Sequence, residues 1–421
     1  MAFVKLPVKG MCDFLPEEKA LREKLLKKIK ENYSTYGFEE IETPMMEHIE
    51  NLCSKQGGDN EKLIFKVLKR GAELSRALEN GGELSDCGMR YDLTVPLARY
   101  YSSNMNNLAS PFKALQVGPV WRADNPQKGR FRQFVQCDID ILGDGTNFAE
   151  IELIGATTNM LTDILAATSV GELIVHVNDR KILIAAALKS GFKEEDISSV
   201  LVSLDKLDKI GFDGVKAELL EKGYEEAVVK AYLDIYQSAV EGISCKEFCD
   251  KTLGEAIGSE VVDNLQEIIS CASKLVNAPA RVQFDPTLVR GMGYYTGPIF
   301  EISVANYNFS VAGGGRYDTM IGKFIGVETP AVGFSIGFER IVTILKDYEK
   351  GEGVSKQNSV VYLVDKKLST AEKDKVFAEA KERRAAGYTV LIQPMKKNMK
   401  FQIDALNKSG YNDIVKVYHR D

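Results

Sequence analysis

The sequence predicts an α+β fold in which an antiparallel sheet is flanked by helices. Three patterns support this prediction. Residues 112–142 alternate between apolar and polar side chains on either side of a polar turn, as a β-hairpin does. Residues 180–276 contain no proline and read as successive helices separated by glycines, which indicates a helical insertion. No regular βαβ alternation precedes residue 355, whereas a β-α-β unit follows it, so a small C-terminal α/β module is expected.

The elements around the hairpin follow from local patterns. Residues 19–33 place apolar side chains at helical spacing, which predicts a helix that ends at Gly37. The next residues, 38–44, read as a strand that stops at its proline, because proline cannot donate to a sheet ladder. After the hairpin, helical periodicity returns over 148–166, and a strand is predicted over 173–177.

Strand-like sequence resumes after the insertion. The predicted elements there are a helix that begins near Gly337 and strands over 280–284, 299–304 and 309–312. A charged, glycine-bearing linker over 347–358 then precedes a strand, a helix and a strand over 359–364, 370–386 and 388–392. We therefore expect a main body in two segments, 1–180 and 277–348, a helical insertion, 181–276, and a C-terminal domain, 355–421.

The composition excludes several classes of protein. A content of 44% hydrophobic and 27% charged residues excludes a disordered or fibrous chain. No run of about 18 apolar residues is present, and early charges at Lys5, Lys9 and Asp13 leave no signal peptide, so we expect no membrane segment. Seven cysteines without a CxxC pair indicate a reducing compartment, the cytoplasm. Three scattered histidines argue against a zinc hydrolase or a serine-type triad.

Charge is distributed unevenly along the chain. Residues 355–421 hold 14 lysines and arginines against 8 acidic residues, a net of +6. The remainder holds 40 basic and 52 acidic residues, a net of −12. A basic module on an acidic body is typical of a nucleic-acid contact, and a solvated lysine-rich helix face explains the same numbers equally well.

The second strand of the hairpin carries the most informative pattern. Strand periodicity separates an apolar face from a polar face. The apolar set is Val135, Cys137, Ile139 and Ile141, and the polar set is Gln136, Asp138 and Asp140, in phase with Arg132 and Phe134. Two interpretations are open, because the polar face either meets solvent or lines a cleft. In a cleft, the carboxylates would select a cationic ligand, since an unpaired buried charge is costly.

The turn of the hairpin is rich in arginine. Arg122, Lys128, Arg130 and Arg132 surround it, and guanidinium forks suit phosphate groups. Acidic residues that select a cation, next to arginines that bind phosphate, suggest a site that joins an amine to a nucleotide.

Two glycine-rich segments have no established phosphate-loop spacing. Residues 313–318, GGGRYD, lack the Gly-Lys-Ser/Thr of a Walker loop and the GxGxxG of a dinucleotide fingerprint, so three glycines after a strand indicate close backbone approach or a tight turn. Residues 290–297, RGMGYYTG, place an arginine and two phenols among flexible residues. Paired tyrosines are explained by packing more often than by ligand contact.

Five segments occur in an order that is similar to one family. They are RYDLTVP (90–96), the hairpin from Trp121-Arg122 to Gln136-Cys137-Asp138, RGMGYYTG (290–297), GGGRYD (313–318) and GFSIGFER (333–340). Together they closely resemble histidyl-tRNA synthetase, a class II aminoacyl-tRNA synthetase. The resemblance covers residues 1–345 well and weakens after 355, where we expect a short anticodon-binding-like domain. It implies the class II antiparallel sheet.

The resemblance implies an adenylation chemistry that uses ATP, with Mg²⁺ expected. The hairpin is similar to motif 2, in which Arg122 holds the α-phosphate and the histidine carboxylate. Arg130 would bind the γ-phosphate and Phe134 would stack on adenine. Arg340 is similar to the motif 3 arginine on ATP. Arg290 would stabilise the charge that develops as the carboxylate attacks phosphorus.

The resemblance also implies a histidine pocket and two macromolecular contacts. Asp92, Thr94 and Gln136 would bind the α-ammonium group, with Leu93 between the first two. Asp140 and Tyr295 would read the imidazole, and Tyr294 would line the pocket. The segment that ends at residue 44 is similar to motif 1, which implies a homodimer, and tRNA is the implied partner. Two positions depart from the family pattern: Asp124 replaces a glutamate that contacts adenine, and Gly293 replaces an aspartate beside Arg290.

The resemblance implies an enzyme that ligates L-histidine to its tRNA through a histidyl-adenylate intermediate. Two other functions compete with this ligase function. The first is the histidine-sensing regulatory subunit of ATP phosphoribosyltransferase, which shares the fold but has no chemical need for the four arginines at 122, 130, 290 and 340. The second is a class II synthetase for another amino acid, which is disfavoured because a carboxylate that faces a phenol suits an imidazole. A generic nucleotide-binding protein would leave the ordered segments unexplained.

Overall fold

The computed structural model describes residues 3–53, 58–127, 129–168, 170–238, 242–290, 293–307, 309–348, 358–411 and 413–420. The chain forms two compact units, Met1–Lys346 and Asp347–Asp421. Lys128, Gly291, Met292 and most of the linker expected over 347–358 lie outside the described residues.

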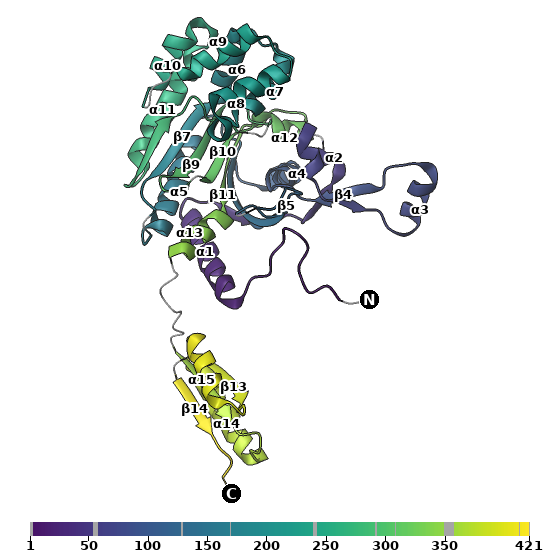
Figure 1. The fold of residues 1–421 in the computed structure, drawn as a ribbon, viewed down its shortest axis with the longest axis vertical. Helices are drawn as coiled ribbons and strands as arrows, with labels where there is room; N and C mark the ends of the chain where they lie inside the picture. The colour runs from purple at the N-terminus through teal and green to yellow at the C-terminus, as the bar shows by residue number, and fades with distance from the viewer. Residues whose placement is uncertain are drawn as a thin grey trace. The chain divides into compact units, whose positions relative to one another are not determined.

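The larger unit is built on one sheet of eight strands in the described chain, in the order β1-β5-β6-β11-β10-β9-β7-β8 (Figure 1). Its central pairs are antiparallel, as the sequence predicts, whereas the two outermost pairs, β1–β5 and β7–β8, are parallel. The strands are β1 (Glu39–Ile41), β5 (Phe112–Trp121), β6 (Gln133–Leu142), β7 (Leu173–Asp179), β8 (Ala280–Phe284), β9 (Pro298–Val304), β10 (Ser310–Arg316) and β11 (Ala331–Gly337).

The predicted hairpin is confirmed as β5 and β6. The two strands pair along ten residues each, from Phe112 opposite Leu142 to Trp121 opposite Gln133. Alternation places the side chains of β6 as predicted, but both faces of the strand are buried over residues 136–142. The reading in which the polar face meets solvent is therefore wrong, and this face lines the interior of the protein.

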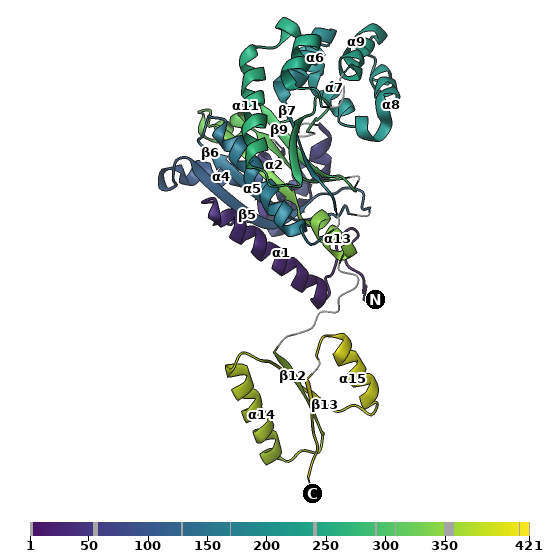
Figure 2. The ribbon, with the colours of Figure 1, turned by 90° about the vertical axis from the view of Figure 1, so that its left-hand side faces the viewer.

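A layer of three helices covers one face of the sheet. Helix α5 (Phe148–Leu165) packs between α1 (Pro16–Thr35) and α11 (Ser259–Leu275), and Figure 2 shows the three side by side. Tyr33 of α1 is fully buried, and its hydroxyl lies 3.1 Å from Oγ1 of Thr157 on α5. Gly37 ends the α1 segment with a φ of +79°, a conformation that glycine adopts without strain.

A buried ion pair joins α1 to α13 (Phe338–Tyr348), the helix predicted from Gly337. The guanidinium of Arg22 donates to both carboxylate oxygens of Glu339, at 2.5 and 2.7 Å. Glu339 also accepts from the backbone N–H of Val135, at 3.2 Å. The pair therefore fixes the start of α13, and with it Arg340, relative to the hairpin.

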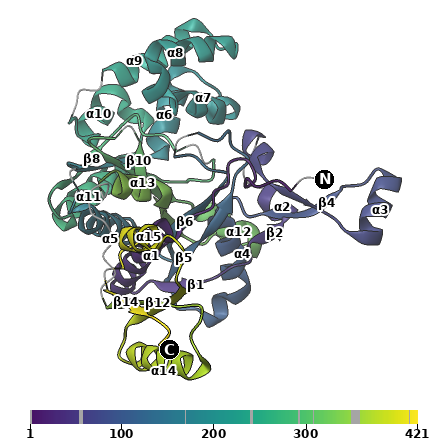
Figure 3. The same cartoon turned by 60° about the horizontal axis from the view of Figure 1, so that its bottom comes forward.

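The insertion is helical, as predicted, and gathers at one end of the sheet (Figures 1 and 3). Its core is aromatic, with Tyr232 packed edge-to-face against both Phe192 and Tyr236. Cys245 and Cys249 are buried in this core, which agrees with a helix face rather than a metal site. The helices are α6 (Arg180–Ser190), α7 (Ile197–Leu204), α8 (Leu207–Glu221), α9 (Glu226–Gln237) and α10 (Cys245–Thr252). The range expected for the insertion also includes α11, which packs instead on the sheet beside α5.

An arm between α1 and β5 has no counterpart in the sequence predictions. It contains a small antiparallel sheet of order β2-β4-β3 and carries α3 at its projecting tip (Figures 1 and 3). Strands of three to five residues are too short to give a clear periodicity, which explains the omission. The elements are β2 (Met46–His48), α2 (Ile49–Cys53), β3 (Lys66–Leu68), α3 (Gly71–Asn80) and β4 (Ser85–Met89).

The smaller unit is a parallel three-stranded sheet of order β13-β12-β14 with helices on both faces (Figure 2). A capping box between Ser369 and Glu372 starts its first helix. The predicted β-α-β unit is confirmed as β12 (Ser359–Val364), α14 (Thr370–Ala385) and β13 (Thr389–Pro394). The structure adds α15 (Met399–Lys408) and β14 (Asp413–Val417).

Candidate active site

A row of directly opposed residues crosses the sheet and defines the floor of the candidate site. Register pairs Asp138 with Ser335, Ser335 with Gly313, Gly313 with Glu301, and Glu301 with His176. Side chains that are directly opposite in a sheet project from the same face. The predicted polar face of β6 therefore continues across β11, β10, β9 and β7 as one surface.

Asp138 and Asp140 are buried on this surface, at 4% and 3% exposure. Burial raises the pKa of Asp138 to about 7, against hydrogen bonds from Ser335 and Gln136 that act to lower it. Burial also raises the pKa of Asp140 well above its usual range, and the charge of Asp138 adds to that effect. Each carboxyl therefore binds a proton more readily than an exposed aspartate does, and a cationic or N–H-donating ligand would favour its ionised form.

Asp140 has one oxygen in use and one available. Its Oδ1 accepts a hydrogen bond from the hydroxyl of Tyr317, whereas its buried Oδ2 has no hydrogen-bond partner among the described residues. Gly333 opposes Asp140 on β11, and a Cβ there would lie 2.0 Å from Oδ1, so only glycine leaves room for the carboxyl. The tyrosine that donates to Asp140 is thus Tyr317, a residue to which the resemblance gave no role.

Tyrosines form one wall around these carboxyls. The rings of Tyr294 and Tyr295 lie 4.8 Å apart between centroids, and Tyr294 meets Tyr317 edge-to-face at 6.0 Å. Burial raises the pKa of Tyr294 well above its usual range; Asp92 raises it further, and a hydrogen bond with Thr94 acts to lower it. The wall thus meets the segment of residues 92–94 at the start of α4 (Thr94–Asn104).

The segment before α4 is held by buried hydrogen bonds. Oδ1 of Asp92 accepts from the N–H of Val95 at 3.0 Å, which satisfies a free donor in the first turn of α4. The side-chain amide of Gln116 donates to the carbonyl of Leu93 at 3.1 Å. Asp92 is 1% exposed and Leu93 equally so, so the backbone and the carboxylate are fixed before any ligand binds.

Gln136 connects the acidic pocket to Arg122. Its Nε2 donates to Ser335 Oγ at 2.9 Å and to Asp138, which leaves Oε1 to accept from Nη2 of Arg122 at 3.2 Å. Arg122 also donates to the carbonyl of Tyr91 at 3.1 Å and lies 5.1 Å from the ring centroid of Phe134. The predicted residues 122, 134 and 136 therefore meet in one place.

The remaining predicted arginines surround the same surface. Arg290 pairs with Glu301 and lies directly over Gly313, where a Cβ would be 2.5 Å from its Nη1. Arg340 donates to Oγ of Ser310 at 3.1 Å. Burial lowers the pKa of Arg340; Glu301 opposes this, and the charges of Arg290 and Arg130 lower it further. Arg290 and Arg130 thus both lie within electrostatic reach of Arg340, and the three guanidinium groups suit the binding of phosphate groups.

Arg130 and Asp124 are the most peripheral members of the set. Nε of Arg130 lies 3.2 Å from Oδ2 of Asp124, and the arginine side chain is 55% exposed. The turn between β5 and β6 therefore brings these two predicted residues together at the edge of the site.

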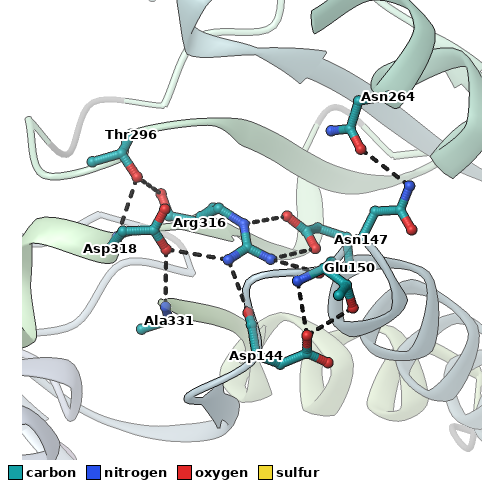
Figure 4. Close-up of polar contacts among 9 residues, drawn as sticks. Asp144, Asn147, Glu150, Asn264, Thr296, Arg316, Asp318 and Ala331 are labelled. Atoms are coloured by element: carbon teal, nitrogen blue, oxygen red, sulfur yellow. Dashed lines mark hydrogen bonds and ion pairs between the residues drawn. The ribbon is translucent and has the colours of Figure 1, made fainter. Parts of the chain in front are cut away.

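The GGGRYD segment has a different role from the one its glycines suggested. The three glycines lie within β10 rather than after a strand, although the close approach expected of them is confirmed. Arg316 donates to both oxygens of Glu150 at 2.6 and 2.7 Å and to backbone carbonyls of residues 144 and 146 (Figure 4). This buried network locks β10 to the start of α5 and presents Tyr317 to Asp140.

Sequence reasoning assigned no individual role to three residues that the structure brings into the site. Tyr317 and Ser335 stood inside quoted motifs, so both carried a signal. Glu301 lies on an ordinary-looking strand, and only its register with β10 places it beside Arg290. Asp138, expected only as a cation-selecting carboxylate of β6, lies opposite Ser335.

The described residues contain no group of three or more His, Cys, Asp or Glu side chains arranged to hold a metal ion. Among the same residues, no helix is both long enough and apolar enough to cross a membrane.

The chain is similar to known proteins of one family. The family model described as histidyl-tRNA synthetase matches residues 10–341. A histidine–tRNA ligase of Leifsonia xyli subsp. xyli is 42% identical over 98% of this chain and 95% of its own length, and one of Christiangramia forsetii is 33% identical over 91% and 85%. The crystal structure of histidyl-tRNA synthetase from Nostoc sp. PCC 7120 matches with a TM-score of 0.75 at 28% identity, covering 99% of this chain and 92% of that one.

A second solved structure bears on the fold alone. It is an ATP phosphoribosyltransferase regulatory subunit/histidyl-tRNA synthetase from Bacillus halodurans C, with a TM-score of 0.77 at 21% identity and full coverage of both chains. The family match and the full-length relatives favour the ligase over the regulatory subunit. This chain belongs to the histidyl-tRNA synthetase family.

Proposed function

We propose that this protein is a histidine–tRNA ligase, which activates L-histidine with ATP and transfers it to the terminal adenosine of its tRNA. One observation carries the assignment: a buried carboxyl with an open oxygen, Asp140, lies on the same sheet surface as the arginine set. An imidazole N–H is a suitable donor to that oxygen, and triphosphate is a suitable anion for the arginines.

In the first step, the histidine carboxylate attacks the α-phosphorus of ATP, a P–O bond forms, and pyrophosphate leaves. We assign Asp92, Thr94 and Gln136 to the α-ammonium group, with Leu93 beside them. Asp140 and Tyr295 read the imidazole, and Tyr294 lines the pocket. Fixed positive charge lowers the barrier where negative charge develops, which is the role proposed for Arg122 and Arg290.

We further assign Arg130 and Arg340 to the outer phosphates of ATP, Phe134 to stacking on adenine, and Asp124 to an adenine contact. Mg²⁺ is expected to arrive with ATP and to neutralise phosphate charge. No carboxylate cluster for it is found in the described residues, so no step is assigned to the metal.

In the second step, a hydroxyl of the terminal adenosine attacks the histidyl carbonyl, and AMP leaves with the former carboxylate oxygen. We propose that the basic C-terminal unit binds tRNA, that two copies associate through α1 and β1, and that the protein acts in the cytoplasm. The body segments 1–180 and 277–348 would form the catalytic domain, with 181–276 as the insertion.

The test is histidine-dependent exchange of pyrophosphate into ATP, followed by charging of tRNA. Both activities are expected. Exchange without charging would locate a defect in tRNA binding, and the absence of both would refute the ligase assignment in favour of a non-catalytic histidine sensor.

A further inference from the structure

His176 of β7 lies outside the proposed set of ligand-binding residues, yet it contacts two elements of the Arg290 environment. Its Nδ1 is 2.8 Å from Oδ2 of Asp285, and its Nε2 is 2.9 Å from Oγ of Ser303. Asp285 directly follows β8 and opens the segment that leads to Arg290, and Ser303 lies on β9 two residues from Glu301.

Asp285 anchors the start of that segment through several bonds. Its N–H donates to the carbonyl of Val177 at 3.0 Å, and its Oδ1 accepts from the N–H and the hydroxyl of Thr287 at 2.9 and 2.7 Å. Burial acts to raise the pKa of Asp285, but the hydrogen bonds from His176 and Thr287 outweigh it and hold that pKa below its usual value. An ionised carboxylate only accepts, so Nδ1 of His176 is the donor.

The same strand holds the next residues of the segment. Asn178, two residues after His176 and on the same face of β7, donates to the carbonyls of Pro286 and Leu288, each at 3.1 Å. The path from Asp285 to Arg290 is therefore attached to β7 at two successive positions.

His176 also lies next to the charge partner of Arg290. Register places His176 directly opposite Glu301, and Glu301 directly opposite Gly313, the residue beneath the Arg290 guanidinium. The imidazole of His176 thus joins Asp285, at the start of the segment that leads to Arg290, to β9, the strand that carries Glu301.

We propose that His176 is a positioning residue for Arg290, which acts by holding Asp285 and Ser303 in a fixed relation rather than by contacting substrate. This inference rests on the proposed function, because it concerns the rate of the adenylation step. A small displacement of the Arg290 guanidinium would lower the rate of adenylation, because the charge must be aligned with the transition state. The same displacement would leave the binding of substrate in the ground state largely intact.

The experiment compares three substitutions at His176 in histidine-dependent pyrophosphate exchange. The side-chain amide of asparagine reproduces the Nδ1 donor, and that of glutamine extends toward the Nε2 position. We expect His176→Ala to lower kcat about tenfold with KM for histidine and ATP within about twofold. His176→Asn should recover most of the loss, and His176→Gln should recover little. His48→Ala, at an exposed histidine of the arm, is the matched control and should be silent.

A double-mutant cycle distinguishes positioning from general destabilisation. If His176 acts through Arg290, then His176→Ala has no further effect on kcat in an Arg290→Ala background. Additive losses, a rise of KM alone, or equal loss in all three His176 variants would overturn the inference. Labelling of Ser303 by a fluorophosphonate would also overturn it. Ser303 would then be a nucleophile activated by His176 and Asp285, a serine-type triad of the kind that the sequence argued against.

The proposed function and the role of His176 can be refuted separately. An unmodified protein without histidine-dependent exchange refutes the proposed function. An unmodified protein with full exchange, a strong Arg290→Ala defect and an unaffected His176→Ala variant refutes only the role of His176.

Discussion

The Asp140→Asn substitution tests the recognition of histidine most directly. The change replaces an ionisable carboxyl with a neutral amide and keeps the shape of the side chain. Its Oδ1 can still accept from Tyr317, while the position of the open Oδ2 is taken by an amide that donates instead of accepting. The fold should survive, because a neutral amide is less costly to bury than a carboxylate.

The expected magnitude follows from the bond that is lost. A hydrogen bond between an N–H group and a buried carboxylate contributes about 1.5–3 kcal/mol. At about 1.4 kcal/mol for each tenfold change in affinity, histidine binding should weaken roughly 10- to 100-fold. Asp140 is 3% exposed, so solvent screening does not reduce this value.

Calorimetric titration of histidine into each protein measures the effect. Asp86→Asn is the matched control, because Asp86 also lies on a strand but is exposed to solvent. The control should bind histidine as the unmodified protein does. Equal histidine affinity in Asp140→Asn and the unmodified protein would show that this carboxyl does not read the imidazole, and the assignment of the pocket would be wrong.

Four further predictions follow from the structure. Arg290→Ala should leave histidine binding within a few fold in calorimetry but lower adenylation at least about 100-fold, since one preorganised donor contributes about 3–4 kcal/mol; lost binding with unchanged adenylation would contradict this. Asp138 has a folded pKa of about 7 against 3.8 for the ordinary group, so the folded protein loses roughly 4 kcal/mol between about pH 4 and pH 7 as the pH rises. Asp138→Asn should therefore be more stable than the unmodified protein at pH 8 and lose this advantage near pH 4, as measured by denaturant unfolding; parallel stability curves would refute the shift. Arg22→Met should cost about 3–5 kcal/mol of unfolding free energy, because it leaves the Glu339 carboxylate buried without its cation, whereas the double variant Arg22→Met/Glu339→Gln should recover part of that loss. Deletion of residues 355–421 should impair tRNA charging far more than pyrophosphate exchange and should flatten the dependence of log tRNA affinity on log salt; full charging with an unchanged slope would mean that the basic unit is only a solvated surface.

Several parts of the fold could be predicted from the sequence because local patterns determine them. The β5–β6 hairpin follows from period-2 alternation around a polar turn, and the helices of the insertion follow from apolar spacing and glycine punctuation. The arm could not be predicted, since its strands are short and its stability depends on packing of Leu52 and Ile64 against Tyr91 and Val95.

The sequence predicted several of the residues that form the candidate site, but not the contacts between them. The resemblance named the arginines, Asp92 and Asp140, because chemistry fixes which residue types such a site needs. It did not name Tyr317, whose hydroxyl donates to Asp140 from a position 177 residues away along the chain. Contacts of that kind depend on the register of β6 with β11 and of β11 with β10, and register is not a local property.

The sequence by itself therefore determined the β5–β6 hairpin, the helices of the insertion, the alternation of β6 and the residue types available for adenylation. Only the tertiary structure decided that the polar face of β6 is buried, that Glu301 accompanies Arg290, and that His176 joins Asp285 to Ser303. The physical reason is that alternation fixes which side of a strand a residue faces, whereas burial depends on what the rest of the chain places over that side. Desolvation and charge pairing act across strands that are distant in sequence, so the pKa of a carboxyl such as Asp138 is a property of the assembled sheet.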